Sequence, residues 1–121
     1  MANNVRLGRQ GEQAAAEYLR SQGYVVLERN YRCPLGELDI VAQKGDVVAF
    51  VEVKTRRSLY YGRPCEAVNY HKRQHIINTA SWYIGSHAAS GVHYRFDVIE
   101  VLAAPGSEMR INHIENAFEA S

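Results

Sequence analysis

Residues 36–42 read GELDIVA and residues 50–56 read FVEVKTR, with a short KGD turn between the two stretches. Both stretches are apolar runs interrupted by charges, and the glycine-containing turn favours a hairpin that pairs them as strands. Side chains at positions i and i+2 of a strand share one face, so Glu52 and Lys54 point the same way. We therefore expect Asp39 of the first strand to be a neighbour of Glu52 on the second.

Two adjacent carboxylates and a lysine on apolar strands indicate metal-assisted chemistry. Two carboxylates that lie close together repel each other, and a hard cation with oxygen ligands relieves that repulsion. Mg²⁺, or Mn²⁺ in its place, suits the pair, since magnesium usually binds through one or two carboxylates together with water and substrate phosphates. The Lys54 ammonium is suited to stabilise the negative charge that develops on a phosphate oxygen during the reaction. The pattern predicts hydrolysis of a phosphate ester without a covalent intermediate.

The remaining sequence predicts helices and further strands around this hairpin. Small and apolar side chains at helical spacing predict a helix over 5–22, ended by Gly23, and a second helix over 64–87. Runs rich in branched and aromatic residues predict four strands, over 24–27, 38–42, 47–53 and 94–102. A short strand and turn near the end would cover a sheet edge. The order αβββαβ predicts one α/β domain over 1–121, with a mixed central sheet flanked by helices.

Length and composition are those of a single soluble domain. The chain has 121 residues, of which 46% are hydrophobic and 22% are charged. The first residues lack the basic start and apolar core of a secretory signal, and no apolar run approaches the ~18 residues of a membrane span. We therefore expect a cytoplasmic protein without a membrane partner. The isolated Cys33 and Cys65 suggest neither a zinc site nor a disulfide framework.

A basic tract begins at the lysine of the second quoted stretch. From Lys54 to Arg73 the chain carries six basic residues against the single acid Glu66, although the net charge of the protein is only +1. Such a tract alone is often a solubilising surface, but next to an acidic cluster it suits an extended polyanion, because Lys and Arg bind phosphates without reading bases. We predict contacts with nucleic acid, and specifically DNA, through Arg56, Arg57, Arg63, Lys72 and Arg73.

Over essentially its whole length the sequence resembles the YraN-like family of small bacterial proteins. The resemblance rests on GE at 11–12, GELDIVA at 36–42, FVEVKTR at 50–56 and RFDVI at 95–99. It implies a predicted endonuclease similar to Holliday-junction resolvases, within the PD-(D/E)xK nuclease superfamily, and therefore a restriction-endonuclease-like fold. In that pattern Asp39, Glu52 and Lys54 are catalytic, and the two carboxylates bind the metal. Leu38 stands where the superfamily name has proline.

The resemblance also draws attention to acids outside this set. The resolvase-like branch adds a glutamate from the first helix, and Glu12 matches it, which implies a further catalytic and metal-binding residue; a helix glutamate is otherwise most often solvated. For Glu37 two alternatives remain open: it is either a partner of Asp39 or a solvated side chain. For Asp97 we expect a structural partner such as Arg95 rather than a catalytic role.

Three functions remain open from the sequence. The first is a metal-dependent endonuclease that hydrolyses DNA phosphodiesters, with branched or junction DNA as candidate substrates. The second is a non-catalytic nucleic-acid binding module that retains the nuclease fold, and the third is a hydrolase of a small phosphorylated compound. The complete set of Asp39, Glu52 and Lys54 favours the first, because carboxylates near phosphate weaken simple binding. Junction cleavage needs two sites, so a homodimer is open as well.

Overall fold

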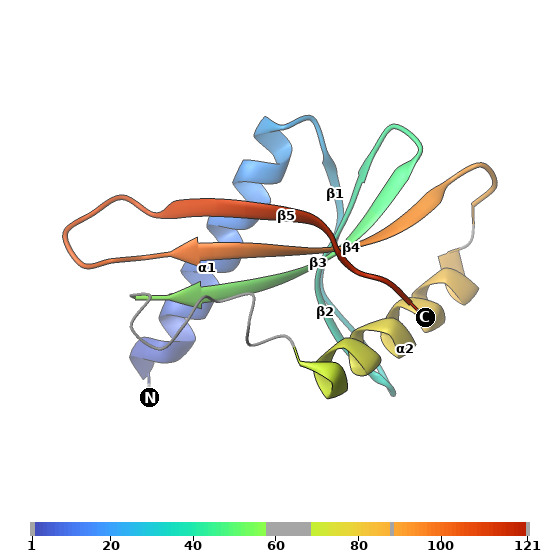
Figure 1. Ribbon diagram of the computed structural model, residues 1–121, viewed down its shortest axis with the longest axis horizontal. Coiled ribbons are helices and arrows are strands. Elements are labelled where there is room, and N and C mark those ends of the chain that lie inside the picture. The colour runs from blue at the N-terminus through green and yellow to red at the C-terminus, as the bar shows by residue number, and fades with distance from the viewer. Residues whose placement is uncertain (1, 58–68, 88, 121) are drawn as a thin grey trace.

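The described residues form a five-stranded mixed sheet and two helices (Figure 1). The computed structural model describes residues 2–57, 69–87 and 89–120, with residues 2–4 described by their backbone only. The elements are α1 (Ala2–Ser21), β1 (Val25–Cys33), β2 (Gly36–Lys44), β3 (Val47–Arg56), α2 (Tyr70–His87), β4 (His93–Leu102) and β5 (Arg110–Phe118). The predicted α/β class is confirmed, as is the mixed sheet flanked by helices.

The strands lie in the sheet in chain order, β1-β2-β3-β4-β5. The first three form an antiparallel meander, and β3 pairs with β4 in parallel, with α2 in the connection between them. The edge strand β5 runs antiparallel to β4, so β4 lies in the interior of the sheet as predicted. In the described part of the chain, neither helix combines the length and the apolar character that a membrane crossing needs.

Both edge strands are longer than the sequence predicted. The first continues past Leu27 to Cys33, and the tail forms the full strand Arg110–Phe118, so the order is αβββαββ rather than αβββαβ. Edge strands carry many polar side chains because part of their surface faces water, and this hides them from a search for apolar runs. The described part of the second helix starts at Tyr70, so its predicted start at 64–68 lies outside the described residues.

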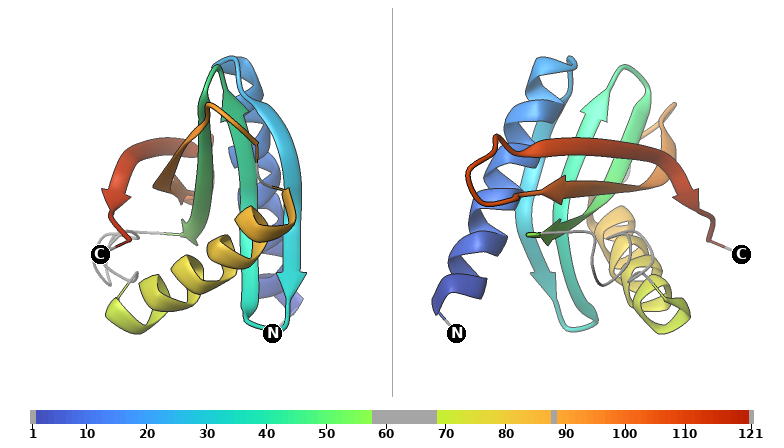
Figure 2. Two further views of the ribbon diagram at one scale, coloured as in Figure 1. Left: turned by 90° about the vertical axis from the view of Figure 1, so that its right-hand side faces the viewer. Right: turned by 60° about the vertical axis from the view of Figure 1, so that its left-hand side comes forward.

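The two helices cover opposite faces of the sheet (Figure 2). Along β3 the side chains alternate: Ala49 and Val51 pack in the cluster under α1, whereas Val48 and Phe50 pack in the cluster under α2. A strand that is buried on both faces reads as a continuous apolar run, as 47–51 does. A charged side chain on β3 therefore has to be accommodated under one of the two helices.

The end of α1 is set by Gly23, as the sequence predicted. The Tyr24 amide donates to the Leu19 carbonyl at 3.0 Å, and the Gly23 amide donates to the Arg20 carbonyl at 3.1 Å. Gly23 has a φ of 92°, a left-handed conformation that glycine adopts without strain. Tyr24 and Leu19 are both buried in the cluster under α1. This Schellman motif turns the chain directly into β1 and fixes how α1 lies on the sheet.

A buried carboxylate ties β5 to the rest of the sheet. Asp97 of β4 is fully buried and is bonded by Arg95 Nε at 2.8 Å, His113 Nε2 at 2.7 Å and the Asn116 amide at 3.0 Å. Burial alone would raise the pKa of Asp97, but the hydrogen bonds from His113 and Arg95 outweigh it and lower that pKa. The expectation that Asp97 has a structural partner in Arg95 is confirmed.

Helix α1 approaches β3 most closely at Gly11. A Cβ atom built at Gly11 would overlap the Thr55 hydroxyl and would lie 2.9 Å from Thr55 Cβ, whereas one at Gly8 meets nothing within 4 Å. The missing side chain at Gly11 therefore lets the helix rest directly on the strand. This contact brings the next residue of the helix, Glu12, beside β3.

We predict opposite effects for alanine at these two glycines. Gly8→Ala should raise the free energy of unfolding by about 0.5–1 kcal/mol, because alanine favours the helix. Gly11→Ala should lower it by at least about 1 kcal/mol, because overlap with Thr55 outweighs that gain. Urea denaturation of both variants measures the difference, and equal stabilisation by the two substitutions would contradict the close contact.

Candidate functional site

The site forms where β2 and β3 stop pairing. Their ladder runs from Lys44 opposite Val47 to Ile40 opposite Val51, and beyond it the two strands diverge (Figure 2). The next position of that register places Asp39 opposite Glu52. There the Val53 amide, which has left the ladder, donates to Asp39 Oδ2 at 2.8 Å. The carboxylate thus takes the place of a backbone carbonyl at the end of the ladder.

A cleft of about 350 Å³ opens at this divergence. It is lined by residues from α1, β2 and β3: Leu7, Gly8, Glu12, Asp39, Glu52, Val53, Lys54 and Thr55. All four side chains that were predicted to be catalytic therefore come together in one place. The predicted alternation along β3 also holds, because Phe50 packs under α2, whereas Val51 and Val53 pack under α1.

Asp39 and Glu52 are close enough to share a proton. Burial and the neighbouring Glu52 charge raise the pKa of Asp39 from its ordinary value of 3.8 to about 8, against the opposing effect of the Val53 amide. A hydrogen bond between the two carboxyl groups contributes to the same rise. In the absence of a cation, the pair therefore holds a proton in place of one negative charge near neutral pH.

Two ammonium groups contact the same oxygen of Glu52. Lys54 Nζ lies 3.4 Å and Lys72 Nζ lies 3.2 Å from Glu52 Oε1, and Glu52 itself is only 5% exposed. Burial alone would lower the pKa of Lys72, but the nearby carboxylates, with Glu52 foremost, raise it on balance. A buried carboxylate with two cations gives the cleft the mixed charge that suits an anionic ligand and a cation together.

Lys72 is a member of this site that sequence reasoning assigned elsewhere. We predicted it as one of several surface contacts for phosphate, but the structure places its ammonium on Glu52. The Asn69 side chain accepts a hydrogen bond from the Lys72 amide at 3.0 Å and so caps α2, which sets Lys72 in the first helical turn. The Asn three positions before Lys72 was the available sequence signal for the cap, but it does not reveal the contact with Glu52.

Glu12 lies in the cleft without completing a set of three ligands. Burial raises its pKa, and the charges of Glu37 and Glu52 act in the same direction, against a hydrogen bond with Asn30 and the charge of Arg29. Over the described ranges, no three His, Cys, Asp or Glu side chains are close enough to hold a metal together. The role of Glu12 as a metal ligand stays a prediction.

Other predicted residues lie around or outside the cleft. Glu37 forms an exposed ion pair with Arg32 at 3.3 Å, so its solvated alternative is the observed one. At the far end of β3, Arg56 is half-buried and Arg57 is exposed. Arg73 is half-buried beside Lys72, and Arg63 lies outside the described residues.

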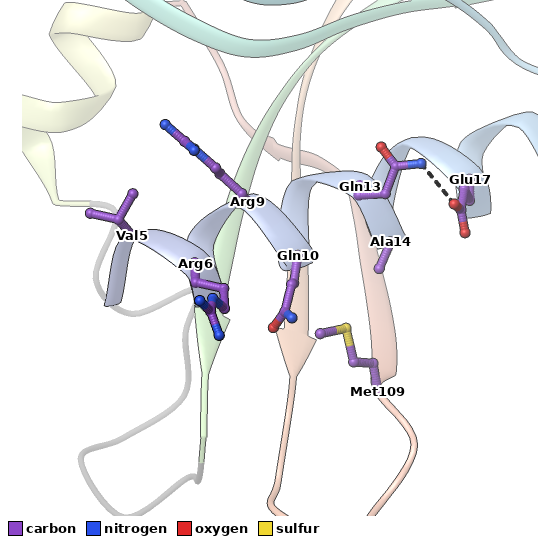
Figure 3. Close-up of a pocket in the computed structure, with 8 residues that line it drawn as sticks. All are labelled: Val5, Arg6, Arg9, Gln10, Gln13, Ala14, Glu17 and Met109. Atoms are coloured by element: carbon purple, nitrogen blue, oxygen red, sulfur yellow. Dashed lines mark hydrogen bonds between the residues drawn. The ribbon is translucent and has the colours of Figure 1, made fainter. Parts of the chain in front are cut away.

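A larger hollow lies on another face of α1, away from the carboxylate pair. It has a volume of about 780 Å³ and is formed by α1 and Met109, the residue before β5 (Figure 3). In this view Arg6 and Arg9 extend from the helix, and Gln13 is bonded to Glu17. No pair of adjacent carboxylates lines it. The smaller cleft therefore holds the predicted site residues, although it is not the larger space.

Asp39 makes a testable contribution to the pH dependence of folding. In chelator, the folded protein keeps the Asp39 proton up to about pH 8, whereas the unfolded chain loses it above its ordinary pKa of 3.8. The free energy of unfolding should therefore fall as the pH rises through this window, by up to about 1.4 kcal/mol per pH unit. Asp39→Asn, whose amide oxygen can still accept from Val53, should flatten the dependence and be the more stable protein at pH 8. Parallel urea-denaturation profiles for the two proteins would refute this.

The comparisons with known proteins agree on one family. The family model described as "Uncharacterised protein family UPF0102" matches residues 11–101. A UPF0102 protein of Alkaliphilus metalliredigens is 51% identical over 112 residues, which cover 93% of this chain and 96% of the relative. One of Clostridium acetobutylicum is 50% identical over 96% of both chains, and one of Clostridioides difficile is 48% identical over 96% of this chain and 99% of its own. The chain therefore belongs to the UPF0102, or YraN-like, family.

Proposed function

We propose that this protein is a metal-dependent endonuclease that hydrolyses phosphodiester bonds of DNA. The observation that carries the proposal is the pair formed by half-buried Asp39 and buried Glu52 in one cleft, with the Lys54 ammonium on the Glu52 carboxylate. Burial and the Glu52 charge raise the pKa of Asp39 in the metal-free protein, and two oxygen ligands of this kind fit Mg²⁺ or Mn²⁺. The proposal includes the assignment of the α/β sheet to the restriction-endonuclease-like fold.

Each residue of the site has a separate task in this proposal. Asp39 and Glu52 would hold the metal, which when bound supplies Lewis-acid activation of the phosphodiester and of the attacking water. The hydrogen bond from the Val53 amide orients the Asp39 carboxylate, so one ligand is fixed before the cation arrives. Lys54 carries the charge that can stabilise negative charge on a phosphate oxygen. Glu12 enters from α1 as a further acid of the cleft.

The arginines beyond Lys54 support a polymeric substrate over a small one. Arg56 ends β3 beyond the cleft and Arg57 follows it, so a chain of phosphates that leaves the site in this direction meets further positive charge. Contacts of this kind position a backbone without reading its sequence. A small phosphorylated compound would have no use for charges outside the cleft.

Binding of a divalent cation should stabilise the folded protein. Metal that binds only the native state, at about 100 times its dissociation constant, raises the free energy of unfolding by about 2.7 kcal/mol. Thermal melts in Mg²⁺ or Mn²⁺ should therefore rise above melts in chelator, and Asp39→Asn should abolish the rise. Arg57→Ala, at an exposed position outside the cleft, is the control that should keep it. An unchanged wild-type melt at millimolar metal would count against the site.

Cleavage should depend on Lys54 far more than DNA binding does. Lys54→Ala should reduce the cleavage rate by at least two orders of magnitude, about 2.7 kcal/mol of transition-state stabilisation. Its affinity for DNA, measured in Ca²⁺ without cutting, should change much less. In the same assay Arg57→Ala should weaken binding and flatten the slope of log affinity against log salt by about 0.9 on duplex, with the chemical step intact.

The substrate is best found by a screen of DNA structures. Branched, flapped, nicked and single-stranded DNA, each with Mg²⁺ and with Mn²⁺, compare the candidates directly, and Lys54→Ala reports any contaminating nuclease. DNA binding without cleavage of any of them, by a protein that binds metal, would favour the non-catalytic binding module. Cutting of junctions by a strictly monomeric protein would exclude the need for two coupled sites.

A further inference from the structure

One carboxylate oxygen of the cleft is surrounded by two cations. Glu52 Oε1 is contacted by the ammonium groups of both Lys54 and Lys72, at 3.4 and 3.2 Å. A hard cation that takes Glu52 as a ligand needs the lone pairs of the same carboxylate. It also brings a charge that repels both ammonium groups. The second oxygen of Glu52 can serve as a ligand, and repulsion between the cation and the two ammonium groups favours withdrawal of the less constrained lysine when a metal binds.

The geometry distinguishes the two lysines. Lys54 lies on the same strand as Glu52, two residues along the same face, and its side chain is 23% exposed. Lys72 reaches Glu52 from the first turn of α2, and its side chain is 45% exposed. A long side chain with almost half its surface in water can move into solvent without unburying a packed residue. Lys72 is therefore the lysine whose side chain can move away from Glu52 into solvent.

The position of Lys72 on its helix makes this contact dependent on Glu52. The exposed N–H groups at the start of a helix disfavour a cation there, and the first turn of α2 holds no acid to offset it. Glu52 is under α2 because it has the same side-chain direction as Phe50, which packs in the α2 cluster. The carboxylate of β3 thus supplies the counter-charge that the helix itself lacks.

We propose that Lys72 is an internal counter-ion of the metal site: it occupies Glu52 in the metal-free protein and is displaced from it when a divalent cation binds. This inference rests on the proposed function and adds a positioning residue to it. Lys72 keeps the Glu52 carboxylate neutralised and in place until the metal arrives, at the cost of weaker metal binding. After the exchange its ammonium is free of the carboxylate and can serve an anionic substrate.

Four proteins test the exchange: wild type, Lys72→Met, Lys72→Arg, and Arg73→Met as the matched control. Arg73→Met removes a positive charge from the same helical turn, and among the described residues Arg73 has no ion pair with the site. Calorimetric titration with Mn²⁺ in the absence of DNA gives the dissociation constant. Thermal melts in chelator and in saturating Mn²⁺ give the stability of each state.

The exchange predicts a crossover that a purely structural ion pair would not produce. Lys72→Met should bind Mn²⁺ on the order of tenfold more tightly than Arg73→Met, because the metal no longer has to displace an ammonium. In chelator its melting temperature should be lower than that of wild type by about 4 °C or more, and saturating Mn²⁺ should remove the difference. Lys72→Arg, which keeps the charge, should stay close to wild type in both measurements.

The outcomes separate the two proposals. If the wild type binds Mn²⁺ and Lys72→Met binds it no more tightly than Arg73→Met, Lys72 is not displaced and the inference is overturned, whereas the metal site stands. If Lys72→Met is equally destabilised with and without saturating Mn²⁺, the lysine is a structural contact and the inference is again overturned. If the wild type binds no Mn²⁺, both the proposed function and this inference fail.

Discussion

The site depends on the hydrogen bond that the Val53 amide donates to Asp39. It lies at the end of the β2–β3 ladder, where β3 turns away from β2 and continues beside β4. A backbone amide that leaves a ladder in the interior needs another acceptor, since an unpaired buried donor is costly. A carboxylate can serve as that acceptor and still present its other oxygen to the cleft. The break in the sheet and the position of the acid therefore have one cause.

The charges of the cleft come from both faces of the sheet. Glu12 arrives from α1, which rests on β3 through the side-chain-free surface of Gly11, and Lys72 arrives from the capped first turn of α2. Asp39 and Glu52 lie between the two helices on adjacent strands. The two acids remain tolerable because the raised pKa of Asp39 favours its neutral form and Glu52 contacts two ammonium groups. A cation or an anionic ligand can replace the proton or the ammonium contacts with little change in free energy.

The charges around Asp97 differ from those of the cleft because each has a hydrogen-bonding partner, and this explains their structural role. Asp97 is fully buried, and its oxygens are occupied by Arg95, His113 and the Asn116 amide. Its pKa is lowered, whereas that of Asp39 is raised. The difference lies in the partners: Asp97 faces donors that favour its charge, and Asp39 faces another carboxylate. The fully hydrogen-bonded Asp97 therefore joins β5 to β4, whereas the mutually repelling Asp39 and Glu52 line a cleft that is open to a ligand.

The sequence by itself determined the features that depend on neighbours a few residues apart. The two-residue period of β3 placed Glu52 and Lys54 on one face, a short turn set Asp39 against Glu52, and Gly23 ended the first helix. Only the tertiary structure decided that Lys72 contacts Glu52, that His113 and Asn116 bind Asp97, and how far the polar edge strands extend. These contacts join residues from different elements, whose relative positions follow from the packing of two helices on a twisted sheet and leave no periodic trace in the chain.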